Sequence, residues 1–105
     1  RDGKEPDFRN SIKESISAVE YVVRDITGAS TLGDGLNKLE KKGIKINVCL
    51  KEAFDKLYAY TNSEDGIRHA NMNNNNVSFD EAKFMLVVCS SFINYITSKR
   101  SQLKN

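Results

Sequence analysis

The sequence predicts an all-α protein, a four-helix up-and-down bundle, and three observations lead to that prediction. Apolar residues recur at spacings of three and four in four separate segments, the period expected of helices that each bury one face. The 105 residues include a single proline. The alternation typical of a strand is confined to a few residues after Gly43, too few to build a sheet.

The length of the chain fits one domain with one hydrophobic core. We therefore treat residues 1–105 as a single helical domain. Residues 1–6 are mostly charged and contain Gly3 and Pro6, which predicts a linker. Because the first residue is Arg1 rather than Met, we expect either a processed chain or a domain excised from a longer protein, and we favour the excised domain. The N-terminal remainder of that parent protein is then an expected partner.

The first predicted helix runs from about Asp7 to Thr27, and Gly28 ends it by adopting a positive φ. Its apolar face consists of Phe8, Ile12, Ile16, Val19, Val22, Val23 and Ile26. A second, shorter helix is predicted from about Leu32 to Lys42. Two glycines, Gly33 and Gly35, weaken it by about 1 kcal/mol each relative to alanine. Its apolar stripe is Leu32, Leu36 and Leu39.

The third predicted helix runs from about Val48 to Tyr60, with Asn47 as its N-cap. The polar, asparagine-rich tract 71–76 that follows predicts a surface loop. The buried face predicted for this helix is Leu50, Ala53, Phe54, Leu57 and Tyr58.

The fourth predicted helix has the clearest start signal, a capping box formed by Ser78 and Glu81, and it continues to about Lys99. Its central turns are apolar on every side, which indicates a helix that is central or shared with a partner. We assign one stripe to the core: Ala82, Met85, Leu86, Cys89, Ile93 and Ile96. The other stripe is Phe84, Val88, Phe92 and Tyr95.

Two interpretations of this second stripe stay open. In the first, the stripe forms a homodimer interface or a contact with the rest of the parent protein. Alternatively, the first helix packs over it.

Charge and cysteine content exclude several functional classes. The net charge of +2 lacks the strong basic excess of a dedicated nucleic-acid binder. Lys38, Lys41, Lys42 and Lys45 form a small basic cluster, in which Lys38, Lys41 and Lys42 are candidate RNA contacts. Contact with an acidic partner, or simple solvation of a charged surface, is the alternative. Cys49 and Cys89 fall inside helical patterns and are predicted to be buried free thiols. With one histidine they make no zinc pattern, so we expect no metal and no cofactor.

No signal segment and no apolar run of about 20 residues is present, so we expect a soluble, cytoplasmic protein with no membrane contact.

One pair of residues has catalytic potential. His69 is the single histidine, and Arg68 precedes it. An imidazole can transfer a proton near neutral pH, and a guanidinium can stabilise a phosphate that gains charge. The structural alternative is that both cations serve the C-terminal end of the third helix. Adjacent residues on a helix also point about 100° apart, which disfavours convergence on one phosphate.

The chain resembles a bacterial HEPN-like helical domain found at the C-terminus of AbiJ-type abortive-infection proteins and related uncharacterised proteins. The resemblance covers about residues 9–97. It is carried by five segments: 10–20 (NSIKESISAVE), 31–39 (TLGDGLNKL), 50–58 (LKEAFDKLY), 65–70 (DGIRHA) and 78–86 (SFDEAKFML).

The resemblance implies a four-helix bundle, usually dimeric, of a kind that includes metal-independent ribonucleases used in phage defence. Their active site places an arginine and a histidine a few residues apart near the last helix. Here Arg68 and His69 occupy a similar region but are adjacent. We therefore expect a catalytically degenerate module that contacts RNA or protein and dimerises through the fourth helix. An active ribonuclease that uses Arg68 and His69 is the alternative.

Overall fold

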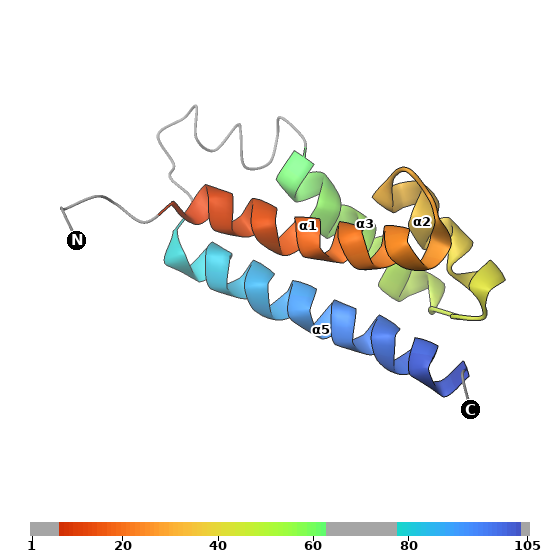
Figure 1. The fold of residues 1–105 in the computed structure, drawn as a ribbon. Helices are drawn as coiled ribbons and strands as arrows, with labels where there is room; N and C mark the ends of the chain where they lie inside the picture. Colours follow the sequence, from red (N-terminus) through yellow and green to blue (C-terminus); the bar gives the residue numbers. More distant parts are fainter. Residues whose placement is uncertain (1–6, 63–77, 104–105) are drawn as a thin grey trace.

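The computed structural model describes residues 7–62 and 78–103. The described residues form four α-helices and one short 3₁₀-helix: α1 (Phe8–Thr27), α2 (Leu32–Lys38), η1 (Glu40–Lys42), α3 (Val48–Asn62) and α5 (Phe79–Leu103). All regular structure in this part of the chain is helical, so the all-α prediction is confirmed. Helices α1 and α5 lie side by side and run in the same direction, whereas α3 runs the opposite way (Figure 1).

The hydrophobic core is centred on the seam between α1 and α5. Ile12, Val19 and Val23 of α1 are fully buried, as are Met85 and Ile96 of α5. Burial of an apolar side chain of this size stabilises a fold by about 1.5–3 kcal/mol. The periodic apolar face predicted for α1 is therefore the face that packs.

Helix α2 is shorter than the sequence predicted, because the chain tightens into a 3₁₀ turn after Lys38. The carbonyl of Leu39 accepts hydrogen bonds from the amides of Lys42 and Ile44, each at 3.0 Å. Gly43 then reverses the chain at a φ of +89°. This turn brings Leu39 and Ile44 into the core together.

The close approach of α2 to α1 depends on Gly35. A Cβ at this position would lie 2.6 Å from Cγ1 of Val23 and 3.1 Å from Oγ1 of Thr27. Gly33 has nothing within 4 Å of its own notional Cβ. Both glycines were expected to weaken α2, but Gly35 is required for the packing of α2 against α1.

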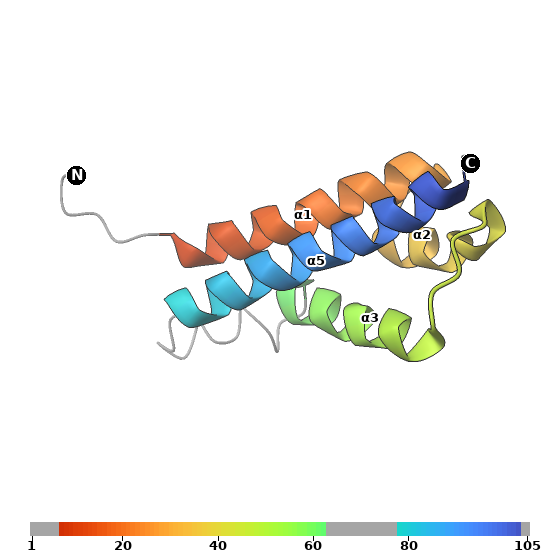
Figure 2. The same ribbon diagram turned by 90° about the horizontal axis from the view of Figure 1, so that it is seen from below.

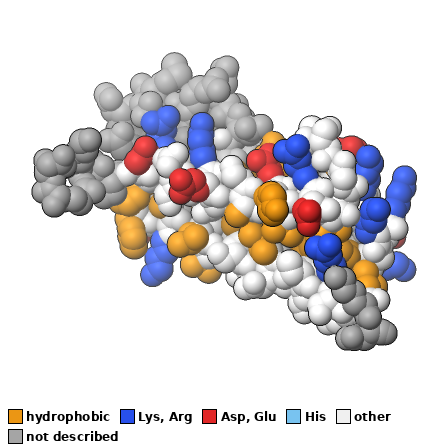
Figure 3. Space-filling model, viewed as in Figure 1, with side chains coloured by type: hydrophobic (Ala, Val, Ile, Leu, Met, Phe, Trp, Pro, Cys, Tyr) orange, Lys and Arg blue, Asp and Glu red, His pale blue; other side chains and the backbone are white. Residues whose placement is uncertain are grey.

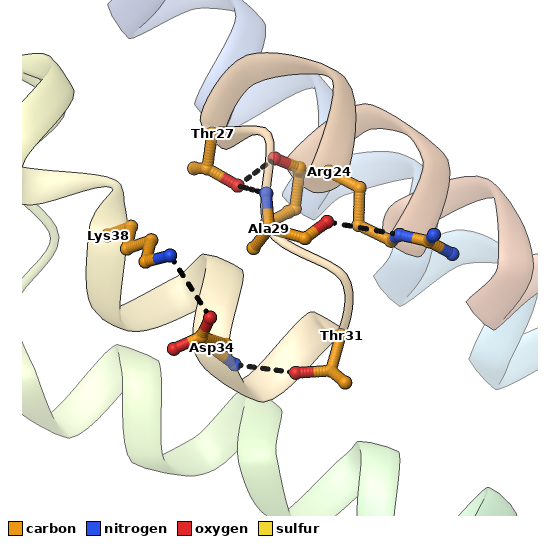
Figure 4. Close-up of polar contacts among 7 residues, drawn as sticks. Arg24, Thr27, Ala29, Thr31, Asp34 and Lys38 are labelled. Atoms are coloured by element: carbon orange, nitrogen blue, oxygen red, sulfur yellow. Dashed lines mark hydrogen bonds and ion pairs between the residues drawn. The ribbon is translucent and has the colours of Figure 1, made fainter.

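Polar contacts fix the turn from α1 into α2 (Figure 4). The Thr27 hydroxyl donates to the carbonyl of Val23 at 2.8 Å and accepts from the amide of Ala29 at 3.2 Å. The Arg24 Nε donates to the Ala29 carbonyl at 3.3 Å. Thr31 then caps α2 through the amide of Asp34, at 3.1 Å.

The other helix starts agree with the sequence. The Asn47 side chain accepts from the amide of Cys49 at 2.8 Å and so caps α3. At α5, the Ser78 hydroxyl accepts from the amide of Asp80 at 3.2 Å, while Glu81 Oε1 accepts from the Ser78 amide at 3.0 Å and also contacts its hydroxyl. The predicted capping box is therefore confirmed.

Helix α3 packs more loosely than the sequence predicted. Phe54 is buried, and Leu57 and Tyr58 are half-buried. Leu50 is 51% exposed and Ala53 is also exposed, so their assignment to the buried face was wrong. Helix α3 lies below the α1–α5 pair in Figure 2, and its exposed residues show that the other described helices cover only one side of it.

Helix α5 buries most of the stripe assigned to the core, but not all of it. Ala82, Met85, Cys89 and Ile96 are buried, and Ile93 is half-buried. Leu86 is 54% exposed, so its assignment to the core was wrong. Leu86 lies at the rim of the α1–α5 contact, where it borders a shallow depression between these two helices.

Candidate interaction surface

The predicted catalytic pair, Arg68 and His69, lies outside the described residues. The two neighbouring elements are described: α3 ends at Asn62 and α5 begins at Phe79. The sequence-based expectations for this pair stay predictions.

The three predicted RNA-contacting lysines lie close together at one end of the molecule. Lys38 is the last residue of α2, and its ammonium pairs with Asp34 at 3.2 Å. Lys41 and Lys42 form most of η1 and are exposed. The pairing with Asp34 partly neutralises Lys38, whereas no ion pair within the described ranges involves Lys41 or Lys42.

Basic side chains are concentrated at this end (Figure 3). Residues 24–52 and 99–103 carry eight lysines and arginines against four aspartates and glutamates. The other described residues carry four basic and six acidic side chains. The described part of the molecule is therefore electrically polarised, with its positive end at α2 and η1.

A groove lies between α3 and α5. One part of it has a volume of about 270 Å³ and is almost entirely apolar. A second part of about 370 Å³ continues it toward the start of α5, and Leu57 borders both. Together these two parts form the α3–α5 groove. It is lined on the α3 side by Leu50, Ala53, Phe54, Leu57 and Tyr60, and on the α5 side by Glu81, Phe84, Met85, Val88, Ser91, Phe92 and Tyr95.

Stacked aromatic rings close the floor of the groove. The rings of Phe54 and Phe92 lie 4.2 Å apart and nearly parallel, at 8°. Phe92 in turn contacts Tyr95, with ring centroids 6.4 Å apart. Such stacks contribute about 0.5–1.5 kcal/mol beyond burial. The Phe54–Phe92 stack holds α3 against α5 at one position along the two helices. The other side chains of the groove stay accessible to solvent.

All four residues of the second stripe predicted on α5 line this groove. Phe84 is 55% exposed, while Val88, Phe92 and Tyr95 are half-buried. The flanking helix is α3 rather than α1, so the alternative in which α1 packs over the stripe is wrong. Among the described residues, a contiguous apolar surface remains accessible between α3 and α5.

A charged residue marks each end of the groove on α5. Glu81 lies at one end, beside Tyr60. Burial raises the pKa of the Tyr60 phenol, and the negative charge of Glu81 raises it further. At the other end the Lys99 ammonium lies 5.4 Å from the centre of the Tyr95 ring, a cation–π distance. Both charges therefore lie beside the apolar stripe.

Hydrophobic side chains are also exposed on the opposite side of α5, over its N-terminal half (Figure 3). Leu86, Val87 and Phe79 are each more than half exposed. Leu86 borders a shallow depression of about 180 Å³ between α1 and α5 that has a mixed lining, including Ser11, Glu14 and Ser90. This side is less apolar than the α3–α5 groove.

The two thiols lie in different environments. Cys89 is buried in the α1–α5 seam, as predicted, and burial raises its pKa to about 11. Cys49 is exposed on α3, so its predicted burial was wrong. Cys49 lies beside the apolar face of α3, and its side chain is exposed to solvent because α3 packs against the other helices on one side only. No cluster of His, Cys, Asp and Glu within residues 7–62 and 78–103 is arranged to hold a metal ion.

Sequence reasoning missed the contribution of α3 to this surface. It assigned Leu50, Ala53 and Leu57 to the core because their spacing matches one helical face. One feature of the sequence could have indicated the exposed surface. With Tyr60 included, the apolar face of this helix is wider than the surface that one neighbouring helix covers.

Comparison of the chain with protein-family models, with curated proteins and with solved structures finds no match. Among the described residues, no helix combines the length and the apolar character that crossing a membrane requires.

Proposed function

We propose that this chain is a helical interaction module that self-associates through the α3–α5 groove and does not act primarily as an enzyme. The observation that carries the proposal is the apolar groove itself. Its lining is predominantly apolar, and the exposed Phe84 and Leu50 border it on opposite sides. Exposed apolar surface of this kind typically marks an interface between proteins.

The HEPN-like resemblance supports the same proposal, since that class of domain is usually dimeric. It also supplies the biological setting that we propose, a bacterial protein of the abortive-infection or phage-defence type. That setting rests on the resemblance alone.

Two residues of α5 give a matched test of the interface. Phe84 and Leu86 are apolar, about equally exposed, and on different sides of the helix, Phe84 in the groove and Leu86 on the other side. We expect Phe84→Glu to raise the dimer dissociation constant at least about tenfold, because it places two charges in a desolvated interface. We expect Leu86→Glu to leave it within about threefold. Sedimentation equilibrium measures both constants.

Two results would contradict the proposal. A wild-type chain that sediments as a monomer at about 100 µM would remove self-association, since a functional dimer of this size is expected to form well below that concentration. Dissociation by Leu86→Glu but not by Phe84→Glu would place the interface on the other side of α5. Circular dichroism of each variant establishes that helix content is unchanged.

RNA is the second partner that we propose, through the basic end. The exposed Lys41 and Lys42 and the excess of positive charge around them support this part of the proposal. The affinity for RNA falls with salt concentration, and the slope of that dependence scales with the number of phosphates contacted. If both lysines contact phosphates, the double variant Lys41→Ala with Lys42→Ala is expected to have the slope of a protein with about two fewer phosphate contacts. Fluorescence anisotropy of a labelled single-stranded RNA at several salt concentrations measures that slope. A slope equal to that of the wild-type chain would contradict this part.

The ribonuclease alternative is tested with the same RNA. Cleavage that disappears in both Arg68→Ala and His69→Ala would establish catalysis by these residues. Intact RNA after prolonged incubation with the wild-type chain would exclude it for that substrate and favour the degenerate module.

A further inference from the structure

The charges beside the groove have a pattern that bears on how two copies can pair. The α5 residues on the groove side follow a three–four spacing at positions 81, 84, 88, 91 and 95. That spacing is the seam of a helix that packs along another helix. The seam begins with an acidic residue, Glu81, and ends beside a basic one, Lys99.

Resting on the proposed self-association, we propose that the two copies pair with their α5 helices antiparallel, so that Glu81 of each protomer faces the partner's Lys99. Glu81 and Lys99 are 18 residues apart, which corresponds to about 27 Å of helix. A two-fold axis that passes midway between Glu81 and Lys99 brings Glu81 of one protomer beside the partner's Lys99. Each interface then contains the same pair twice, as a closed two-fold contact requires.

The midpoint of the seam is suited to close approach. The axis falls near residue 90, and the nearest seam residue is Ser91, which is small and exposed. On either side of it the apolar side chains of Val88 and Tyr95 line the groove. Two helices therefore meet at a small residue, with larger apolar residues interdigitating outward from it.

The acidic group has a free oxygen for such a pairing. Within its own chain Glu81 uses Oε1 to hold Ser78, and a carboxylate accepts hydrogen bonds at both oxygens. Among the described residues no hydrogen bond or ion pair involves Oε2, and this oxygen can face the partner's Lys99. At the other end, the ammonium of Lys99 already lies over the Tyr95 ring, on the groove side of α5.

A parallel arrangement has the opposite electrostatics. Two parallel α5 helices in register place Glu81 beside the partner's Glu81 and Lys99 beside the partner's Lys99. Like charges opposite each other destabilise an interface. The pattern therefore selects the antiparallel orientation among the ways in which two copies can share this groove.

Charge exchange tests the orientation. We expect Lys99→Glu to raise the dimer dissociation constant about tenfold at low salt, because two attractive pairs become repulsive. The double exchange Glu81→Lys with Lys99→Glu restores attraction and returns the constant to within about threefold of the wild type. Lys83→Glu is the matched control, since it makes the same charge change at an exposed position of α5 outside the groove.

The variants at Glu81 also affect the helix cap, so a second variant separates the two effects. Glu81→Gln keeps a side chain that accepts from Ser78 but removes the charge. We expect it to weaken the dimer by a few-fold with unchanged helix content. In a parallel dimer it would instead strengthen association, because it relieves a like-charge contact.

A distance measurement gives an independent result. Spin labels at Ser101→Cys, in a chain with Cys49→Ser, are expected to lie about 30 Å apart or more in an antiparallel dimer, and about 10–20 Å apart in a parallel one. The buried Cys89 is protected from labelling.

The outcomes separate the two proposals. If Phe84→Glu dissociates the dimer but Lys99→Glu behaves like Lys83→Glu, self-association through the groove stands and the antiparallel orientation is overturned. Short label distances overturn the orientation in the same way. If the wild-type chain is monomeric, both proposals are wrong.

Discussion

The two long seams of this molecule, α1 against α5 and α3 against α5, use the same residue types and reach opposite results. The α1–α5 seam is closed, with Ile12, Met85 and Ile96 almost fully buried. The α3–α5 seam is held by the Phe54–Phe92 stack and is otherwise open, with Leu50 and Phe84 more than half exposed. An apolar stripe thus determines that a helix face avoids water, while the neighbouring helix determines whether that face is already covered.

Helix α2 is too short to form a third long seam. At seven residues, α2 spans only about 10 Å, compared with about 30 Å for α1. It therefore covers one end of the bundle and cannot extend along α5 as a fourth full-length helix.

Cys89 lies in the closed α1–α5 seam, and Cys49 lies on α3, beside the open seam. The reactivity of these two thiols is expected to give the largest difference between the seams. Cys49 is exposed, whereas Cys89 is buried with a pKa of about 11. We expect Cys49 to react with a thiol reagent at least about 1,000-fold faster than Cys89 at pH 8, because the thiolate is the reactive form and burial also blocks access. Mass spectrometry of the native chain over time distinguishes the two. Equal rates would mean that the α1–α5 seam opens readily.

Truncation of one side chain in each seam gives the next largest effect. Ile96→Ala removes a fully buried side chain, and we expect it to lower the free energy of unfolding by about 2–5 kcal/mol. Leu50→Ala removes one that is half exposed, and we expect a loss below about 1 kcal/mol for the monomer. Urea unfolding at low protein concentration measures both. Comparable losses would show that α3 packs as tightly as α1.

The two glycines of α2 give the smallest and most specific contrast. Gly35→Ala places a methyl group 2.6 Å from Cγ1 of the buried Val23, and we expect a loss of about 1–3 kcal/mol. Gly33→Ala meets no neighbour, so the better helix propensity of alanine is expected to stabilise the fold by up to about 1 kcal/mol. Thermal unfolding followed by circular dichroism gives the sign of each change. Stabilisation by both substitutions would contradict the close α1–α2 contact.

The sequence by itself determined the elements whose causes are local. Gly28 ends α1 in the left-handed region, Asn47 caps α3, and Ser78 with Glu81 starts α5, each as the sequence predicted. These features depend on backbone angles and on hydrogen bonds across two to four residues, so local sequence is sufficient to specify them. The apolar face of α1 was predictable for a similar reason, since helical periodicity places its residues on one side.

Only the tertiary structure decided which apolar residues are covered. The pattern that correctly assigned Met85 and Cys89 to the core wrongly assigned Leu86 and Leu50, because a helical period does not specify where the neighbouring helix lies. The shortening of α2 has the same origin, since the 3₁₀ turn allows Leu39 and Ile44 to share the core. Burial is a property of two surfaces in contact, and the position of α3, which leaves the α3–α5 groove open, depends on the packing of the whole domain.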